Sequence, residues 1–316
     1  MKIVITGSVA YDYLMTFPGS FKENIIQEKL ESISLSFLVE TLVKRRGGVA
    51  PNIAYNLALL GGNPAIFATV GEDFGEYRAW LEERGVDTSL AKVVDGKFTA
   101  SFFATTDQEN SQLASFYPGA MADAADLSLK DVSPAPDLVL VSPNDPAAMD
   151  KAILECKELG IPYIYDPSQQ IARVEGDVLK AGIDGTLALF VNEYERELTL
   201  KKTGMTQAEI LEQVKFMVVT LGADGIVVYD GDQEVRVPAI SPKQIIDPTG
   251  AGDAFRGGFL TGYSRGWDWA TCAQLGVLTA TYCLESDGPQ GQAYTKEEFI
   301  ARYREEFDDD GLLNTL

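Results

Sequence analysis

The chain has 316 residues, with 26 Lys or Arg against 47 Asp or Glu, so its formal net charge is −21 at pH 7. A surface this acidic repels phosphates, which disfavours nucleic acids and anionic membranes as partners. The chain contains no histidine, which excludes a Ser-His-Asp triad, a Cys-His pair and every His-ligated metal site.

Six short apolar runs predict buried strands, at residues 3–6, 65–70, 138–141, 163–165, 187–191 and 216–221. Segments with helical spacing lie near them, at residues 52–60, 147–159 and 207–213. Strands that alternate with helices predict a mostly parallel sheet covered on both faces, a three-layer α/β core. Ligands of such folds bind beyond the carboxyl ends of the strands.

Two stretches, residues 13–46 and 99–118, interrupt this alternation with Thr-, Phe- and Ser-rich runs of partial period two. They predict a small antiparallel sheet inserted into a core of residues 1–12, 47–98 and 119–316. A sheet that projects from the ligand edge would form a lid. Two ordinary surface excursions are the alternative.

The three cysteines, Cys156, Cys272 and Cys283, form no CxxC pair and are typical of reduced thiols in a cytoplasmic protein. No apolar run reaches the ~20 residues that span a bilayer. The first residues lead directly into a strand, so we expect no secretory signal.

The strongest motif is DPTGAGDAF at residues 247–255, which leads into a helical segment. Gly250, Ala251 and Gly252 let a ligand approach the backbone, and their N–H groups lie at a helix start, where an anion is stabilised. Asp253 can accept the proton of a hydroxyl that attacks phosphorus. A glycine-rich turn whose Asp253 only complements the helix dipole is the alternative. The chain has no GxxxxGK[ST] loop, and GAGDAF does not complete GxGxxG.

A second motif, GGVAPNIAYNLALLG, occupies residues 47–61. Gly48 belongs to a turn that can approach a ligand, and Asn52 can donate to and accept from vicinal hydroxyls. Asp12 follows the first strand, and by itself would be interpreted as a turn residue.

The two motifs resemble the C-terminal and N-terminal signatures of the PfkB, or ribokinase-like, carbohydrate and nucleoside kinases. They begin 200 residues apart and occur in the expected order. The resemblance covers essentially the whole chain and implies a ribokinase-like αβα core with a β lid. It implies ATP-dependent phosphorylation of a sugar hydroxyl, with Asp253 as general base and a 250–252 anion hole. It also implies that Asp12 accepts bonds from two sugar hydroxyls.

The same resemblance implies the nucleotide site. Asn192 and Glu195 match an NxxE pattern that orders water and Mg²⁺ around the ATP phosphates, although a generic helix N-cap would look the same. Residues 220–225 resemble the loop under the ATP ribose and phosphates, and residues 287–290 the loop beside the base; Pro289 departs from the family pattern in the latter. The expected nucleotide contacts are Asn192, Thr220, Gly222, Gly225, Gly288 and Gln290. A K⁺ ion would map near Asp247 and residues 287–290.

The acceptor is suggested by strings that resemble bacterial adenosine kinases, at residues 7–12, 16–19, 34–39, 110–121 and 166–170. The resemblance assigns Phe102 and Phe116, both on predicted lid strands, to a sandwich around a purine base; packing within the lid, or a dimer contact, is the alternative. The polar contacts expected with the base and ribose come from Ser8, Ser36, Gln169 and Gln170. Asp12, Gly48 and Asn52 would hold the ribose 2′- and 3′-hydroxyls.

The resulting hypothesis is phosphorylation of a nucleoside 5′-hydroxyl, adenosine giving AMP, with ATP and Mg²⁺. A sugar kinase for ribose or fructose, a kinase for another nucleoside, and an inactive nucleotide-binding sensor remain alternatives. A homodimer through an exposed face of the lid is a further hypothesis. Arg256 is interpreted as a helix-surface residue and is left out of the site.

Overall fold

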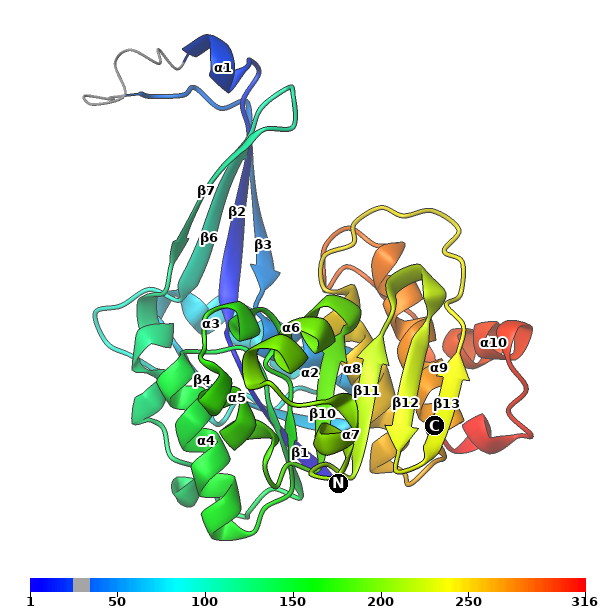
Figure 1. The fold of residues 1–316 in the computed structure, drawn as a ribbon. Helices are drawn as coiled ribbons and strands as arrows, with labels where there is room; N and C mark the ends of the chain where they lie inside the picture. The colour runs from blue at the N-terminus through cyan, green and yellow to red at the C-terminus, as the bar shows by residue number, and fades with distance from the viewer. Residues whose placement is uncertain (25–34) are drawn as a thin grey trace.

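The protein is described by a computed structural model for residues 1–24 and 35–316. Its core is a nine-stranded sheet of order β13-β12-β11-β10-β9-β8-β1-β4-β5 (Figure 1). All neighbouring pairs are parallel except β11–β12 and β12–β13. The strands are β1 (Lys2–Thr6), β4 (Asn63–Val70), β5 (Ala91–Val93), β8 (Leu138–Val141), β9 (Tyr163–Tyr165), β10 (Ala188–Asn192), β11 (Phe216–Thr220), β12 (Ile226–Asp230) and β13 (Gln233–Val237).

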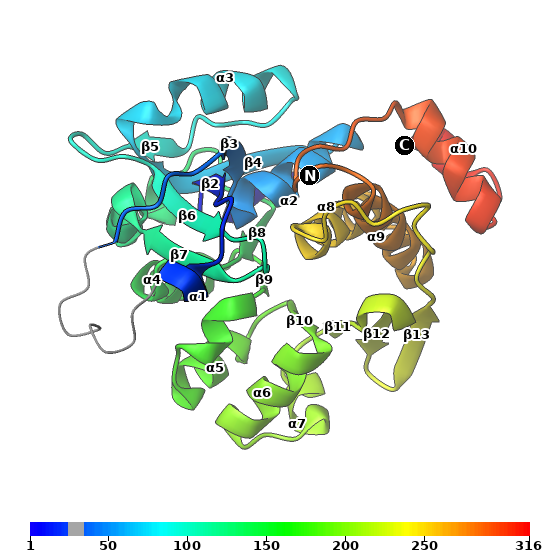
Figure 2. The same cartoon turned by 90° about the horizontal axis from the view of Figure 1, so that it is seen from above.

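Helices cover both faces of this sheet, as the view from above shows (Figure 2). One face carries α2 (Val49–Leu59), α3 (Gly75–Glu83), α8 (Ala251–Ser264), α9 (Trp269–Leu284) and α10 (Lys296–Glu306). The other carries α4 (Pro146–Leu159), α5 (Gly176–Ile183), α6 (Glu193–Thr203) and α7 (Gln207–Leu211). No helix in the described ranges is long and apolar enough to cross a membrane.

Two apolar cores result, one on each side of the sheet. In β1, Ile3 and Ile5 pack into the core under α2, α8 and α9, whereas Val4 packs into the core under α4 and α5. A strand buried on both faces needs no polar alternation, which is why the central strands are continuous apolar runs in the sequence. The predicted three-layer α/β fold is confirmed.

The second sheet has the order β3-β2-β6-β7 and projects from the core, with the short helix α1 (Phe21–Asn24) at its tip (Figure 1). Its strands are β2 (Ala10–Thr16), β3 (Thr41–Gly47), β6 (Ala100–Thr106) and β7 (Gln112–Tyr117). The prediction of an antiparallel sheet is wrong in one respect: β2 and β6 pair in parallel. Both strands leave the core in the same direction, and each pairs in antiparallel fashion with the strand that follows it. Because β2 begins at Ala10, the predicted boundary between residues 12 and 13 falls inside this strand.

Helices α8 and α9 pack with almost no space between them. A Cβ atom at Gly258 would lie 2.4 Å from Thr279 Oγ1 and 2.5 Å from the carbonyl oxygen of Leu275, both on α9. The second contact is with backbone, which cannot move away alone. Glycine at this position therefore sets the distance between the helix that carries the catalytic motif and its neighbour.

We expect Gly258→Ala to lower the free energy of unfolding by about 1–3 kcal/mol, because the added methyl forces the two backbones apart. Gly75→Ala is the matched control, since Gly75 lies in right-handed helical conformation at the start of α3 with no atom within 4 Å of an added Cβ. That variant should be neutral or stabilising by about 0.4–1 kcal/mol. Urea unfolding measures both, and equal stabilities would contradict the close packing.

Candidate active site

The DPTGAGD motif forms a turn that leads into α8. Gly250 is the N-cap of this helix, with φ 80° and ψ 2°, a left-handed conformation that glycine adopts without strain. The N–H of Ala251 bonds to the carbonyl of Pro248 at 3.4 Å. The next two N–H groups, of Gly252 and Asp253, lie in the first helical turn, where the helix itself supplies no acceptor. With the positive end of the helix dipole, they make a turn suited to an anion.

The carboxylate of Asp253 stands beside this turn and is partly buried. Its Oδ2 accepts a hydrogen bond of 2.8 Å from Nδ2 of Asn52 on α2. The pKa of Asp253 is raised to about 7, mainly by burial. The bond from Asn52 and the charge of Arg256 oppose this rise, and the charges of Asp166 and Glu195 add to it. A carboxylate that titrates near neutral pH is suited to accept a proton and release it again.

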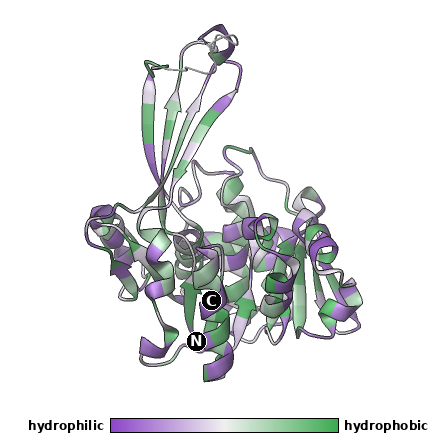
Figure 3. Ribbon diagram, turned by 60° about the vertical axis from the view of Figure 1, so that its left-hand side comes forward, coloured by the Kyte–Doolittle hydropathy of each residue, from purple (hydrophilic) through white to green (hydrophobic). Residues whose placement is uncertain are grey.

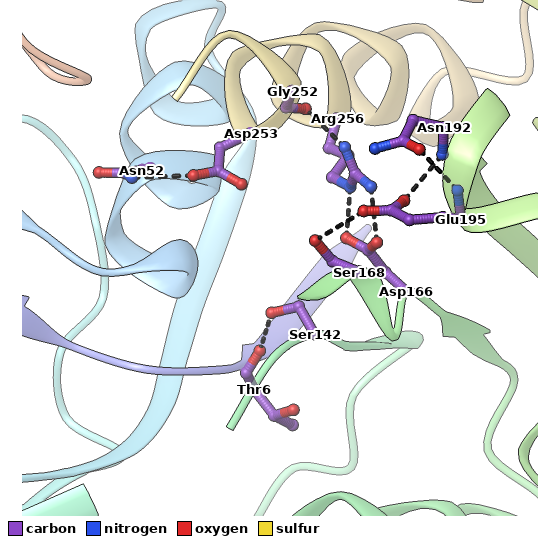
Figure 4. A network of polar contacts seen from close by, with 10 residues as sticks. All are labelled: Thr6, Asn52, Ser142, Asp166, Ser168, Asn192, Glu195, Gly252, Asp253 and Arg256. Carbon is purple, nitrogen blue, oxygen red and sulfur yellow. Dashed lines mark hydrogen bonds and ion pairs between the residues drawn. The ribbon is translucent and has the colours of Figure 1, made fainter. Parts of the chain in front are cut away.

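Arg256 is not on the surface, so the interpretation from the sequence is wrong. The residue is 6 % exposed, and its Nε and Nη2 donate to the two carboxylate oxygens of Asp166, which is 1 % exposed (Figure 4). Nη1 donates to the carbonyl of Gly252 at 2.9 Å. Because residues three apart share a face of a helix, the position of Arg256 relative to Asp253 was a signal in the sequence. Its partner, at the end of β9, was not.

A second chain of hydrogen bonds reaches Asp253 from the base of the lid. Nε2 of Gln290 donates to Oδ1 of Asn52 at 2.7 Å and is 2.6 Å from the hydroxyl of Tyr77. That hydroxyl donates to the carbonyl of Gly47, the last residue of β3. The side chain of Gln290 is buried and directed at Asn52, so its predicted contact with the nucleotide base stays a prediction. Tyr77 was not predicted as a site residue.

The lid contributes a row of side chains from its four strands. Strand register aligns Arg45, Asp12, Phe102 and Phe116 as neighbours, and aligned residues project from one face of a sheet. The guanidinium of Arg45 lies 2.7 Å from Oδ2 of Asp247, so this face looks toward the catalytic turn. Because Phe102 and Phe116 are directly opposite each other on adjacent strands, they favour a two-ring platform over the expected sandwich.

The first strand and α2 meet beside this row. Gly48 has φ 96°, and a Cβ atom there would lie 2.5 Å from the carbonyl oxygen of Ser8. Glycine is therefore required by backbone contact. The hydroxyl of Ser8 accepts a bond from the N–H of Val49 at 3.2 Å, which places it at the start of the helix that carries Asn52.

The remaining residues predicted to bind the acceptor make no hydrogen bond to the catalytic turn in the described part of the chain. Gln170 is buried and its Nε2 donates to the carbonyl of Asn144 at 2.8 Å. Gln169 is exposed in the short 3₁₀ helix Ser168–Ala172 that follows β9. Ser36 is exposed next to the part of the chain outside the described residues. Of the string 34–39, residue 34 lies outside the described ranges. The substrate contacts assigned to these side chains stay predictions.

The expected nucleotide residues lie at the ends of β10 and β11. Asn192 and Thr220 are register partners, and Gly222 follows in a short 3₁₀ turn with φ 60° and open space around an added Cβ. Gly225 differs, because a Cβ there would lie 2.1 Å from the carbonyl oxygen of Val237. Glycine is thus structural at 225, whereas Gly222 leaves room for a ligand.

Asn192 and Glu195 form a capping box. Oδ1 of Asn192 accepts from the N–H of Glu195, and Oε2 of Glu195 accepts from the N–H of Asn192, each at 2.8 Å. Oε1 of Glu195 accepts from the hydroxyl of Ser168 at 3.3 Å (Figure 4). Over residues 1–24 and 35–316, no three His, Cys, Asp or Glu side chains converge as direct metal ligands. These groups therefore fit Mg²⁺ held through water, the mode that Mg²⁺ favours.

The donors expected for K⁺ fit less well. Oδ1 of Asp247 accepts from the N–H of Thr249 at 2.9 Å and Oδ2 pairs with Arg45. The other guanidinium nitrogen of Arg45 pairs with Asp287. The guanidinium of Arg45 thus already pairs with Asp247 and Asp287 in the region to which K⁺ was mapped, and a second cation beside it would be repelled.

Comparisons with known proteins agree with this geometry. The sequence model of the pfkB family carbohydrate kinases matches residues 6–296 of this chain. The nucleoside kinase of Methanocaldococcus jannaschii is 29 % identical over 95 % of this chain and 96 % of its own. The structure of Burkholderia thailandensis nucleoside kinase in complex with inosine is 36 % identical, with a TM-score of 0.84 over 96 % of this chain and 98 % of its own. The adenosine kinase of Sinorhizobium meliloti, 24 % identical with a TM-score of 0.74 over 97 % and 99 % of the two chains, shares the fold. The chain belongs to the pfkB family of carbohydrate kinases.

Proposed function

We propose that the protein is an ATP-dependent nucleoside kinase that phosphorylates the 5′-hydroxyl, with adenosine as the acceptor. The observation that carries this proposal is the row on the lid, where Asp12 lies beside Phe102 and Phe116 on the face that looks toward Asp247. A carboxylate binds vicinal hydroxyls and aromatic rings stack on a base. A nucleoside offers both groups, whereas a free sugar has no base to stack.

In the proposed reaction, Asp12 and the loop at Gly48 hold the ribose 2′- and 3′-hydroxyls, and the 5′-hydroxyl faces Asp253. The 5′-oxygen forms a bond to the γ-phosphorus as the bond to the bridging oxygen of ADP breaks. The proton of the hydroxyl passes to Asp253, whose Oδ2 is engaged by Asn52, so Oδ1 is assigned as the acceptor. The first-turn N–H groups of α8 stabilise the charge on the transferred phosphoryl group.

Asn192, Glu195, Thr220 and Gly222 would lie along the ATP phosphates and ribose at the ends of β10 and β11. Bound Mg²⁺ would neutralise phosphate charge during transfer. Asn192 and Glu195 would orient the water shell of this ion, because Oδ1 of Asn192 and Oε2 of Glu195 already accept the backbone bonds of the capping box. We include no K⁺ in this proposal, because Arg45 already pairs with Asp247.

The pH dependence of the reaction tests the role of Asp253. A base must be deprotonated to act, so kcat/KM should fall as the pH drops through about 7, the pKa of Asp253. The charged groups that face this carboxylate are Arg256 on α8, Asp166 after β9 and Glu195 on α6. Arg256→Met should move the acidic limb to higher pH, because a positive charge is lost. Asp166→Asn should move it to lower pH, because a negative charge is lost.

Shifts of the acidic limb in opposite directions, in Arg256→Met and Asp166→Asn, distinguish an electrostatic effect on Asp253 from a loss of structure. Breaking a buried pair costs about 3–5 kcal/mol of stability from either side, so a purely structural role would reduce activity in both variants and leave the limb in place. Melting curves identify any variant that fails to fold. Limbs that shift in the same direction, or do not move, contradict the proposed tuning of Asp253.

The acceptor is tested by ATP-dependent release of ADP with adenosine, inosine, guanosine, cytidine, ribose and fructose. We expect turnover with adenosine that Asp253→Asn abolishes. Phe116→Ala should raise KM for adenosine by about one order of magnitude, the loss of one stacked base. The control is Phe98→Ala, because Phe98 is 63 % exposed and lies outside the strands of the lid.

Results of this assay other than turnover with adenosine would indicate a different function. Turnover with a free sugar alone would keep the kinase and refute the stacking platform, and preference for another nucleoside would correct the base. Nucleotide binding without ADP release under any acceptor would support an inactive sensor.

The opposite face of the lid suggests a second copy of the chain as its partner. This face carries Leu42, Phe103, Leu113 and Tyr117, which are 62, 37, 45 and 43 % exposed. Hydrophobic segments are visible along the projecting strands (Figure 3). No Asp or Glu of the four strands points to this face, in a chain whose net charge is −21. We propose that two lids pair through these exposed apolar residues, because no carboxylate of the strands adds there to the repulsion between two acidic chains.

Light scattering should give a mass of twice the 34.4 kDa chain. Phe103→Glu should give the mass of one chain, since a carboxylate would be buried at the centre of the contact. Leu154→Glu on α4, where Leu154 is 59 % exposed, should leave the mass unchanged. A wild-type protein with the mass of one chain would overturn the dimer.

A further inference from the structure

Arg45 lies where three parts of the chain meet. It projects from β3 of the lid, its Nη1 is 2.7 Å from Oδ2 of Asp247 in the catalytic turn, and its Nη2 pairs with Asp287 in the loop after α9. Its register partner on β2 is Asp12. One guanidinium thus faces three carboxylates that come from separate elements.

We propose that Arg45 is the built-in cation of the catalytic turn, which holds Asp247 and Asp287 together and makes phosphotransfer independent of a dissociable monovalent cation. This inference rests on the proposed kinase function and concerns the residue that positions its catalytic turn. Arg45 touches no reacting atom and acts through Asp247.

The turn needs a cation because of how Asp247 is used. Oδ1 of Asp247 accepts the N–H of Thr249, and this bond shapes the backbone that leads to Gly250 and the N–H groups of α8. Burial alone would raise the pKa of Asp247, but the bonds from Thr249 and the charge of Arg45 outweigh it and lower this pKa. Without Arg45, the ionised Asp247 would face Asp12 and Asp287 uncompensated.

The loop after α9 packs against this side chain. Gly288 has φ 81°, and a Cβ atom there would lie 3.4 Å from Cδ and 3.7 Å from Nε of Arg45. A Cβ atom at Gly250 would lie 2.4 Å from Cβ of Pro289, so the same loop is also packed against the catalytic turn. Arg45, residues 287–290 and the start of α8 therefore form one contiguous unit.

The neighbouring cations of β3 do not share this role. Lys44 and Arg46 point to the opposite face of the sheet, where Lys44 lies 3.7 Å from the ring centre of Tyr11 and Arg46 lies 4.1 Å from that of Trp80. Cation–π contacts satisfy them on that face. Because side chains alternate between the two faces of β3, only Arg45 of these three consecutive cations points toward the catalytic turn.

The first experiment uses the wild-type protein. ADP release with adenosine and thermal melting are measured in KCl and in choline chloride at equal ionic strength. We expect kcat to differ by less than about twofold and the melting temperature to be the same, since a cation that bound the native state would stabilise it. A several-fold activation by K⁺, or a melting temperature raised by K⁺ over choline, would overturn the proposal.

The second experiment removes the fixed cation. Arg45→Met should lower kcat in choline by about tenfold to a hundredfold, as expected when catalytic groups are misplaced. K⁺ or methylguanidinium should restore part of this loss, and K⁺ should raise the melting temperature of this variant. Arg45→Lys should fall between the two, because a point charge cannot bridge two carboxylates as a planar fork does. Arg236→Met removes an exposed, ion-paired arginine of β13 and should change neither quantity.

An unchanged kcat in Arg45→Met would overturn the proposal. A lower kcat that neither K⁺ nor methylguanidinium restores, in a variant with the melting temperature of the wild type, would also overturn it. If Arg45→Met fails to fold, Arg45→Lys and the wild-type cation comparison decide. Failure of the inference is distinct from failure of the proposed function. Wild-type turnover that requires K⁺ refutes only the proposed role of Arg45. No turnover in either salt with any acceptor refutes the proposed kinase function, and in that case the melting temperatures still report whether K⁺ binds.

Discussion

The ion pair between Arg256 and Asp166 is the interaction on which the rest of the site depends. It joins α8 to the end of β9 and places a buried positive charge among Asp253, Asp166 and Glu195. Coulomb attraction in this low-dielectric region compensates the carboxylates, which would otherwise protonate or repel one another. The same arginine donates to the carbonyl of Gly252. The first turn of α8 is thereby held in the position where its N–H groups and Asp253 can serve one reaction.

Asp253 is held from two sides by different means. The charge of Arg256, which is paired with Asp166, acts on it from the core. Neutral hydrogen bonds reach it through Asn52 and Gln290 from Tyr77 and the end of β3. The first side sets how readily Asp253 takes a proton. The hydrogen bonds on the second side connect the carboxylate of Asp253 to the end of β3, where the lid joins the core. A movement of the lid can therefore be transmitted through these bonds to the carboxylate.

The alternation of side chains along a β-strand divides the functions of the lid. On one face, Asp12 and Phe116 stand with Arg45, which reaches the catalytic turn. On the other face, exposed apolar residues such as Leu42 and Phe103 lie on the same side as Lys44 and Arg46, and no carboxylate of the four strands points there. A sheet of four short strands can therefore serve a small polar ligand and a large apolar contact at the same time.

Much of this protein follows from its sequence alone. The apolar runs at 138–141 and 163–165 coincide with β8 and β9, because strands buried on both faces need no other signal. The DPTGAGD motif gave the helix start and its carboxylate, because the conformational demands on Gly250 are local. The tertiary structure alone decided which charges meet. Arg256 and Asp166 are 90 residues apart, Tyr77 and Gln290 are 213 apart, and Arg45 and Asp247 are 202 apart. Whether a polar side chain is solvated or buried beside a partner depends on how distant segments pack, and no local pattern encodes that packing.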